Sequence, residues 1–370
     1  MLLSLKRDTL LKPLLMTTGF VEKRQTMPIL SNVYLRKIGN EITVVANDME
    51  IQASIITSGE MQGEDFTITL PAKKLQDVLK VFPEDQDIKF SEQQGSKVVI
   101  SCGKTKFSLQ SMDAMHYPLL KLSEDVVCQF DISQAKLKHM LSQIQYCMAD
   151  KDSRVFLNGM YFEIKNDQLR LVATDAHRLG TITATISPTA TNASAIIPRK
   201  TILELYRLLD DDDKSDVLVK IYGNQVYFET QNKQLITKVI DGKYPDYERV
   251  IPIGNTKLCL VNRLELLECV ERVCVIGIDK LKTLTFDFTK NHLTLSCKNE
   301  EQEDSIDELD VTYPDDESLN VSFNMTYMRD LLLNTANDTI QFAFLNNQKS
   351  ILVTIPDNND FKAVIMPLRN

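Results

Sequence analysis

The strongest constraint on the fold of this chain is a pattern that recurs three times along its 370 residues, with a period of roughly 125 residues. An amphipathic helix is predicted to open each copy, at residues 5–14, 132–141 and 261–270, because apolar residues fall three and four positions apart. Ser133 is well placed to cap the second of these helices.

Three further kinds of segment follow in the same order. An alternating strand that ends in polar residues occupies 42–48, 169–175 and, more weakly, 293–299. A strand end then runs into a second helix, with Pro71 and Pro198 in its first turn, where the missing N–H would be unpaired anyway. An alternating run followed by Tyr-Pro or Met-Pro closes each copy. Four segments in one order at one period make chance a poor explanation.

The repeat predicts three domains, at residues 1–127, 128–255 and 256–370. Short alternating runs between the helices read as strands, so each domain is predicted to be α+β, with two helices on antiparallel sheet. The predicted helices span residues 5–16, 72–82, 133–145, 199–209, 261–272 and 325–334.

The distribution of charge changes the meaning of the net charge of −9. An acidic chain argues against a nucleic-acid-binding protein, whose domains are often basic. The predicted helices, however, hold 14 Lys and Arg against seven Asp and Glu, so they carry +7 and leave −16 for the remaining chain. Lys and Arg are common on solvated helix faces, but equivalent helices of three copies can also form one basic surface for a polyanion.

The two terminal domains differ in charge. Lys97, Lys104 and Lys106 lie on predicted strands of the first, whereas seven acidic residues fall between 300 and 310 in the third. An acidic run is usually a solvated loop. Opposite charges at the two ends of a repeat array nevertheless suit head-to-tail association, which closes into a ring if the rotation allows.

The sequence gives little support for an enzyme or an exported protein. Seven cysteines without a CxxC pair favour a reducing cytosol, and no apolar run approaches 18 residues. The common nucleotide-binding, metalloprotease and hydrolase motifs are missing. Asp175 and His177 could belong to a metal site or a hydrolase, although a structural His is the more frequent outcome. We therefore expect a cytoplasmic protein without metal, cofactor or membrane contact.

Several motifs stand in order along the whole chain and carry a family resemblance. They are Lys12-Pro-Leu14, Thr26-Met-Pro-Ile-Leu-Ser-Asn32, Leu157-Asn-Gly-Met160, Ala173-Thr-Asp-Ala-His-Arg-Leu179, Pro198-Arg-Lys200, Asp241-Gly-Lys-Tyr-Pro-Asp-Tyr247 and Met366-Pro-Leu-Arg369. As a set they closely resemble the bacterial DNA polymerase III β subunits, the sliding clamps.

The resemblance implies a non-catalytic, head-to-tail homodimeric ring of six similar domains, with helices inside and antiparallel sheets outside. Double-stranded DNA would thread the ring without sequence specificity. The ring would tether the replicative polymerase, confer processivity and serve as a docking hub for the clamp loader, other polymerases and repair proteins through short peptide motifs. A metal-assisted hydrolase and a transcriptional regulator on a related fold remain the alternatives.

The resemblance also implies three sets of site residues. The DNA contacts would be Arg24, Lys73, Lys151, Arg199 and Lys200. The apolar cleft for partner peptides would comprise Leu157, Thr174, His177, Arg178, Leu179, Pro245, Arg249, Val250, Tyr327, Val364, Ile365, Met366, Pro367, Leu368 and Arg369. The dimer interface would comprise Lys104, Lys106, Phe107, Leu109, Val275, Ile276, Glu300, Glu301, Glu303 and Asp304.

Two positions depart from the family pattern near the expected cleft. Ala176 stands where the family often has Gly, which adds a methyl group, and the chain ends in Asn370 rather than an apolar residue. The departure at Asn370 is expected to alter the preference for partner peptides.

Overall fold

The structure is a computed structural model. It describes residues 2–21, 27–93, 95–189, 191–212, 214–277, 283–299 and 301–368. The backbone forms two compact units: unit 1 comprises residues 1–136 and 203–239, and unit 2 comprises residues 137–202 and 240–370.

One order of elements, β-α-β-β-β-β-α-β-β-β, recurs three times, with one added short strand in the first copy. The first copy holds β1 (Leu3–Lys6), α1 (Arg7–Thr17), β2 (Asn32–Ile38), β3 (Glu41–Asn47), β4 (Ile51–Ser58), the added β5 (Met61–Gln62), β6 (Phe66–Pro71), α2 (Ala72–Val81), β7 (Asp87–Gln93), β8 (Lys97–Cys102) and β9 (Thr105–Gln110).

The second copy holds β10 (Val126–Ser133), α3 (Gln134–Ile144), β11 (Gly159–Lys165), β12 (Gln168–Thr174), β13 (Arg178–Thr185), β14 (Ala193–Pro198), α4 (Arg199–Leu208), β15 (Asp216–Tyr222), β16 (Gln225–Glu229) and β17 (Lys233–Lys238). The third copy holds β18 (Lys257–Asn262), α5 (Arg263–Val273), β19 (Thr283–Thr289), β20 (His292–Lys298), β21 (Asp304–Asp310), β22 (Leu319–Asn324), α6 (Met325–Asn334), β23 (Thr339–Phe344), β24 (Ile351–Ile355) and β25 (Asn358–Ile365).

The α-helices among the described residues begin and end within two residues of their predicted bounds. Side-chain caps fix several starts: Ser133 Oγ accepts from the Lys136 N–H at 3.2 Å, as predicted, and Asn262 caps α5 in the same way. One detail was wrong. Pro71 and Pro198 end the preceding strands instead of entering the first turn, although α2 and α4 do begin at the predicted residues, Ala72 and Arg199.

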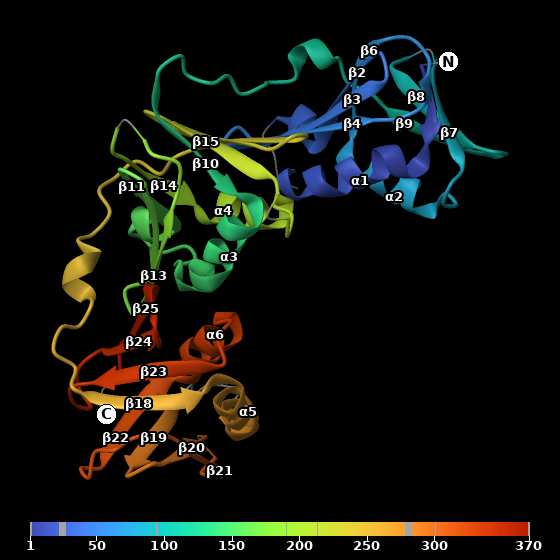
Figure 1. The fold of residues 1–370 in the computed structure, drawn as a ribbon. Helices are drawn as coiled ribbons and strands as arrows, with labels where there is room; N and C mark the ends of the chain where they lie inside the picture. The colour runs from blue at the N-terminus through green and yellow to red at the C-terminus, as the bar shows by residue number, and fades with distance from the viewer. Residues whose placement is uncertain are drawn as a thin grey trace. The chain divides into compact units, whose positions relative to one another are not determined.

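Unit 1 contains an eight-stranded antiparallel sheet in the order β10-β15-β16-β17-β4-β3-β2-β6 and a five-stranded sheet in the order β5-β1-β7-β8-β9. Helices α1 and α2 contact each other and cover one face of the β2–β4 strands (Figure 1). Strands β4 and β17 belong to different copies of the repeat, and their pairing aligns Ala53 with Leu235. We call this pairing seam 1.

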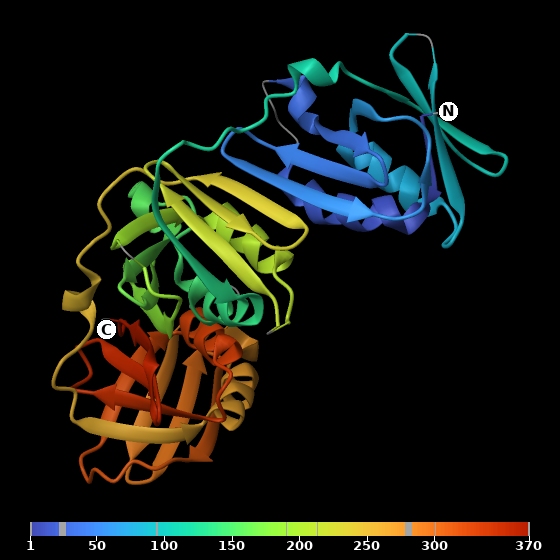
Figure 2. The same cartoon turned by 45° about the horizontal axis from the view of Figure 1, so that its top comes forward.

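Unit 2 has the same design. Its eight-stranded sheet has the order β14-β11-β12-β13-β25-β24-β23-β18, and its four-stranded sheet has the order β21-β20-β19-β22. Helices α5 and α6 contact each other and pack on strands of the third copy (Figure 2). Strands β13 and β25 again come from different copies, and their pairing aligns Gly180 with Ala363. We call this pairing seam 2.

Alternating burial along the strands builds the core. In β12 and β20, for example, apolar side chains on one face are buried while their polar neighbours are more exposed. All seven cysteines are free, and six are buried as small apolar groups, with Cys102 partly exposed. None of the helices in the described ranges is long and apolar enough to cross a bilayer.

Candidate functional site

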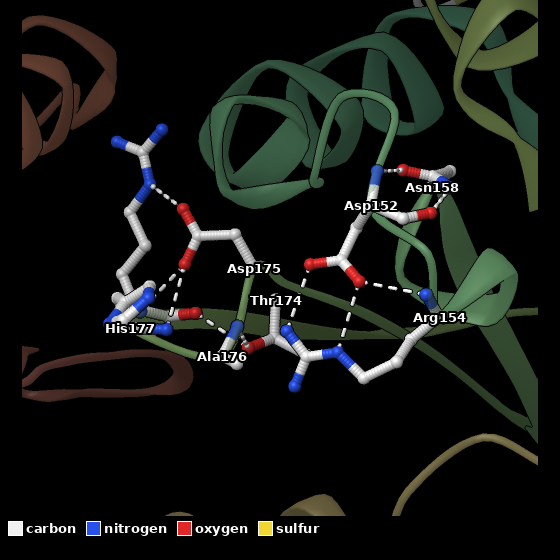
Figure 3. Close-up of polar contacts among 8 residues, drawn as sticks. Asp152, Arg154, Asn158, Thr174, Asp175, Ala176 and His177 are labelled. Carbon is white, nitrogen blue, oxygen red and sulfur yellow. Dashed lines mark hydrogen bonds and ion pairs between the residues drawn. The ribbon is translucent and has the colours of Figure 1, made fainter.

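A tight turn between β12 and β13 organises one end of seam 2. Oδ1 of Asp175 accepts hydrogen bonds from the backbone N–H groups of His177 and Arg178, both at 2.9 Å. Short carboxylates favour such turns because they can bond to the backbone two and three residues ahead. Ala176 adopts a φ of +75°, a left-handed conformation that costs a residue with a Cβ atom. Figure 3 shows this turn.

A cleft lies next to this turn and encloses about 700 Å³, including its open mouth. Without the solvent at its mouth, the cleft has a volume of about 240 Å³, a little below the usual range of roughly 300–1,000 Å³ for ligand sites. The lining residues are Arg154, Phe156, Leu157, Thr174, Ala176, His177, Arg178, Leu179, Pro245, Tyr247, Val250, Val364 and Met366.

The walls of the cleft are buried and apolar, whereas its rim is accessible. Leu157, Leu179 and Val364 are at most 2% exposed and belong to the packed interior. Val250 and Met366 are each 39% exposed. Such a site can hold apolar side chains of a ligand with little rearrangement of its own walls.

Arg178 fixes the position of the cleft wall. Its Nε lies 3.0 Å from Oδ2 of Asp175, and its Nη1 lies 2.7 Å from Oδ2 of Asp330 on α6. The guanidinium also stands 4.4 Å from the ring centre of Tyr327, within cation–π distance. Only 10% of the Arg178 side chain is exposed. Through these contacts, this one cation joins the turn in the second copy to α6 in the third.

His177 continues this arrangement at the surface. Its ring stacks on Tyr327, with centroids 6.5 Å apart and 26° between the planes, and its side chain is exposed. The His177 carbonyl accepts from the Met366 N–H at 2.9 Å, so the same residue holds the segment after β25. Asp175 and His177 therefore serve the turn and the cleft, and the contacts give no support to the hydrolase alternative.

A charged pair stands at the cleft rim. Arg154 donates two hydrogen bonds to Asp152, from Nε at 3.0 Å and from Nη2 at 2.9 Å (Figure 3). These bonds lower the pKa of Asp152 to about 2, so its carboxylate stays ionised at neutral pH. Asn158 braces the same loop, since its Oδ1 accepts from the Asp152 N–H.

Tyr247 forms another side of the cleft. Its hydroxyl donates to Glu163 at 2.7 Å and accepts from Arg170 at 3.1 Å. Burial raises the pKa of Tyr247 to about 12, against the lowering effect of Arg170. The hydroxyl therefore stays protonated and keeps its orientation.

The structure brings most of the expected cleft residues together. Nine of them line the cavity, and Tyr327 stacks behind it. Arg249 instead points into solvent with an ion pair to Asp246, and Ile365 is buried within the sheet. Pro367 and Leu368 do not line this cleft; the Leu368 N–H donates to the Ser322 carbonyl, and Leu368 lines a separate cavity with Ser322. Arg369 lies outside the described residues.

Sequence reasoning missed Arg154, Phe156 and Tyr247 as lining residues. Sequence proximity was the signal that could have found two of them: Phe156 is one residue from Leu157, and Tyr247 is two residues from Pro245.

The expected DNA contacts have varied surroundings. Lys73 is 71% exposed and pairs with Asp77 one helical turn later. Lys151 is exposed with a φ of +59°, and Arg199 donates to the Met148 carbonyl at 3.0 Å. Lys200 is half-buried at the start of α4. Arg24 lies outside the described residues.

The expected dimer residues lie on and near two edge strands. β9 ends the five-stranded sheet and carries Lys106, Phe107 and Leu109, with Lys104 just before it. β21 ends the four-stranded sheet and begins at Asp304, after the exposed Glu301 and Glu303. Val275 is 65% exposed and Ile276 is half-buried, whereas Leu109 already belongs to the core at 8% exposure. Glu300 lies outside the described residues.

Comparisons with known proteins agree along the whole chain. Residues 1–121, 131–246 and 248–369 match the N-terminal, central and C-terminal domains of the DNA polymerase III beta subunit. The chain is 34% identical to the beta sliding clamp of Pseudomonas aeruginosa over 370 residues, and 32% identical to that of Haemophilus influenzae over 366 residues. Each alignment covers 99% of both proteins.

Solved structures give the same result. A sliding clamp from P. aeruginosa bound to griselimycin superposes with a TM-score of 0.93 at 33% identity, covering 99% of each chain. The DNA polymerase III beta subunit of Thermotoga maritima gives a TM-score of 0.90 at 25% identity, covering 100% of this chain and 99% of the other. The repeated fold, the cleft at seam 2 and these full-length matches show that the chain belongs to the DNA polymerase III β-subunit family, the bacterial sliding clamps.

Proposed function

We propose that this chain encircles duplex DNA as a head-to-tail dimeric ring and tethers the replicative DNA polymerase to its template. The observation that carries the proposal is the full-length match to sliding clamps together with the apolar cleft at seam 2. The family consists of non-catalytic processivity factors. The protein would act in the cytoplasm, and its domains would span residues 1–127, 128–255 and 256–370, which the repeated element order supports.

The cleft would receive a short peptide segment of partner proteins, containing Gln and Leu. Its buried walls at Leu157, Leu179 and Val364 suit leucine side chains, and the polar groups at the rim suit a glutamine amide. Polymerases, the clamp loader and repair proteins could then compete for one site, because each would present the same kind of segment.

Ring closure would pair β9 of one copy with β21 of the next. Both are edge strands, so each presents unpaired backbone groups to a partner. Lys104 and Lys106 near one edge would face Glu303 and Asp304 near the other. Burial of Phe107 against Val275 would supply affinity, while the charges would set orientation and association rate.

The DNA would be held by charge without base recognition. The α-helices in the described ranges contain 13 Lys and Arg against seven Asp and Glu, while the whole chain is acidic. Basic helices around a central hole would attract phosphates of any sequence, and the acidic remainder would repel DNA elsewhere. Weak contacts suffice because enclosure itself prevents escape, and weak contacts also permit sliding.

The deciding experiment uses the topology of DNA. The protein is loaded onto a nicked DNA circle with a clamp loader and ATP, and the circle is then cut once. We expect the protein to stay on the circle and to be lost within minutes from the linear form. Retention that does not change on linearisation would refute the ring.

Two variants test the dimer edge. Val275→Asp places a charge at the proposed interface without disturbing the core, since Val275 is 65% exposed. We expect this variant to sediment as a monomer and to fail to stay on circles. Val127→Asp, at a residue 43% exposed on β10 of the second copy and outside the proposed interface, is the matched control and should remain dimeric. A dimeric Val275→Asp variant would remove the proposed interface.

A further inference from the structure

Seam 1 repeats the backbone of seam 2 in detail. Oδ1 of Asp48 accepts from the N–H groups of Glu50 and Ile51 at 2.9 Å, the same distances that Asp175 makes in its own turn. Met49 has a φ of +75°, identical to that of Ala176. The following segments also match, because the Lys238 N–H donates to the Glu50 carbonyl at 2.8 Å as Met366 does to His177.

The packing below the two turns matches as well. Tyr34 and Tyr117 in unit 1 have ring centres 5.5 Å apart, and Tyr161 and Tyr244 in unit 2 have ring centres 4.8 Å apart. Each pair of rings belongs to an apolar cluster that includes a valine of the strand before the turn. Seam 1 therefore has the scaffold of the cleft.

The side chains at the mouth of this scaffold differ. Met49 stands at the position of Ala176 and packs onto the cluster that contains Ile29, Leu30 and Tyr117. Ala176, with a single methyl group, lines an open cleft instead. A methionine at this left-handed position therefore fills space that an alanine leaves free.

Polar groups close the rest of seam 1. Asn47 donates through Nδ2 to the Pro118 carbonyl, and Gln52 accepts from the Leu120 N–H at 2.8 Å. Both bonds fasten the connection that follows Tyr117 onto the seam. In seam 2 the corresponding Thr174 turns its hydroxyl to the Arg178 carbonyl at 2.6 Å, and the corresponding Leu179 has no hydrogen-bonding group in its side chain.

A third difference lies at the edge of the seam. Lys238 takes the place of Met366 and forms an ion pair with Glu50, with Nζ 3.0 Å from Oε1. Glu50 in turn takes the place of His177. An apolar peptide would have to desolvate this pair, which opposes binding.

We propose that seam 1 is a second, latent peptide-binding site, closed by the side chains of Asn47, Met49, Gln52 and Lys238, so that seam 2 is the open docking cleft of the two. The ligand would be the same short peptide with Gln and Leu. This inference rests on the proposed docking role of seam 2. It explains how a chain built from repeats limits the number of partners that bind at one time.

The test exchanges the closing residues between the seams. Four substitutions give seam 1 the residues of seam 2: Asn47→Thr, Met49→Ala, Gln52→Leu and Lys238→Met. Ala176→Met gives seam 2 the residue that fills seam 1. The probe is a fluorescein-labelled short peptide with one Gln and two Leu, followed by polarisation and by titration calorimetry on the full-length protein.

We expect the unchanged chain to bind one peptide and the fourfold variant to bind two. Ala176→Met alone should weaken binding by about tenfold or more, and adding the four substitutions to it should restore at least a tenfold gain. Circular dichroism and peptide binding at the unaltered seam 2 report whether the fourfold variant is folded.

Failure of the inference and failure of the proposed function give different results. An unchanged chain that binds no peptide contradicts docking at seam 2 and removes both. An unchanged chain that binds two peptides overturns only the closure of seam 1. A folded fourfold variant that still binds one peptide, or an Ala176→Met variant with unchanged affinity, overturns the assignment of the closing residues.

Discussion

The two seams differ most at the first residue of the strand that follows the turn, β4 in seam 1 and β13 in seam 2. In seam 1 it is Ile51, which is 2% exposed among apolar neighbours, and it aligns with Thr237 of β17. In seam 2 it is Arg178, which aligns with Ile365 of β25 and is almost as well buried. One scaffold thus accepts either a hydrocarbon or a cation, provided that Asp175 and Asp330 are present to pair with the cation.

This contrast teaches how a repeat can acquire a site. The backbone of the turn depends on Asp48 or Asp175, and it is the same in both copies. The side chains around it decide whether the seam is sealed or open, and whether it is held by apolar packing or by charge. Substitutions at matched positions can therefore separate stability from peptide binding.

The largest effect is expected for Arg178→Ala. Removal of the guanidinium leaves Asp175 and Asp330 as poorly solvated carboxylates, which should cost roughly 3–5 kcal/mol of unfolding free energy and abolish peptide binding. Urea denaturation and the polarisation assay measure the two effects. Ile51→Val, at the matched position, should cost only about 1 kcal/mol and leave peptide binding unchanged. A loss below about 1 kcal/mol for Arg178→Ala would show that the ion pairs do not hold the seam.

Smaller losses of stability are expected when Leu30, just before β2, or Leu157, just before β11, is shortened. Leu30 is 1% exposed in unit 1 and Leu157 is 2% exposed in unit 2, so replacing either by Ala should cost about 2–4 kcal/mol. Only Leu157→Ala should also weaken the peptide, because Leu157 lines the open cleft. Equal losses of peptide affinity in both variants would mean that the two seams are not separate in function.

Glycine at the two left-handed positions should have opposite effects. Ala176→Gly removes a Cβ atom from a residue with φ +75° and should stabilise the protein by up to about 1 kcal/mol. Met49→Gly relieves the same strain but deletes a side chain packed on the apolar cluster, so it should be destabilising. Thermal unfolding of both variants measures the difference, and a stabilised Met49→Gly variant would contradict the filling role of Met49.

The smallest effect is expected at the ion pair of seam 1. Lys238 and Glu50 are 41% and 68% exposed, so the pair should contribute less than about 1 kcal/mol, and less still at high salt. A double-mutant cycle with Lys238→Ala and Glu50→Ala at two salt concentrations measures this coupling. A coupling that is large and independent of salt would place the pair in the core of the seam rather than at its surface.

The family resemblance predicted much of the candidate site. The residues that it placed wrongly or missed have physical explanations. Leu157, Thr174 and Leu179 were expected in the cleft, and they line it. Arg249 was also expected there, but its side chain pairs with Asp246 in solvent. Rotamers of exposed side chains depend on neighbours that sequence spacing does not reveal. Tyr247 was missed because an aromatic residue in a connection can equally face the core or a cavity.

Local sequence determined the helices, most strands and the threefold order of elements. Apolar spacing and capping residues such as Ser133 act within a few residues, so they are legible in the chain itself. The tertiary structure alone decided that β4 pairs with β17 and β13 with β25, across copies of the repeat. These pairings join strands separated by roughly 180 residues. Any edge strand offers the same backbone hydrogen-bonding groups, so these groups do not select the partner strand. The choice of partner depends on how the whole sheets pack. The same packing placed Met49 over one seam and left Ala176 beside an open cleft in the other.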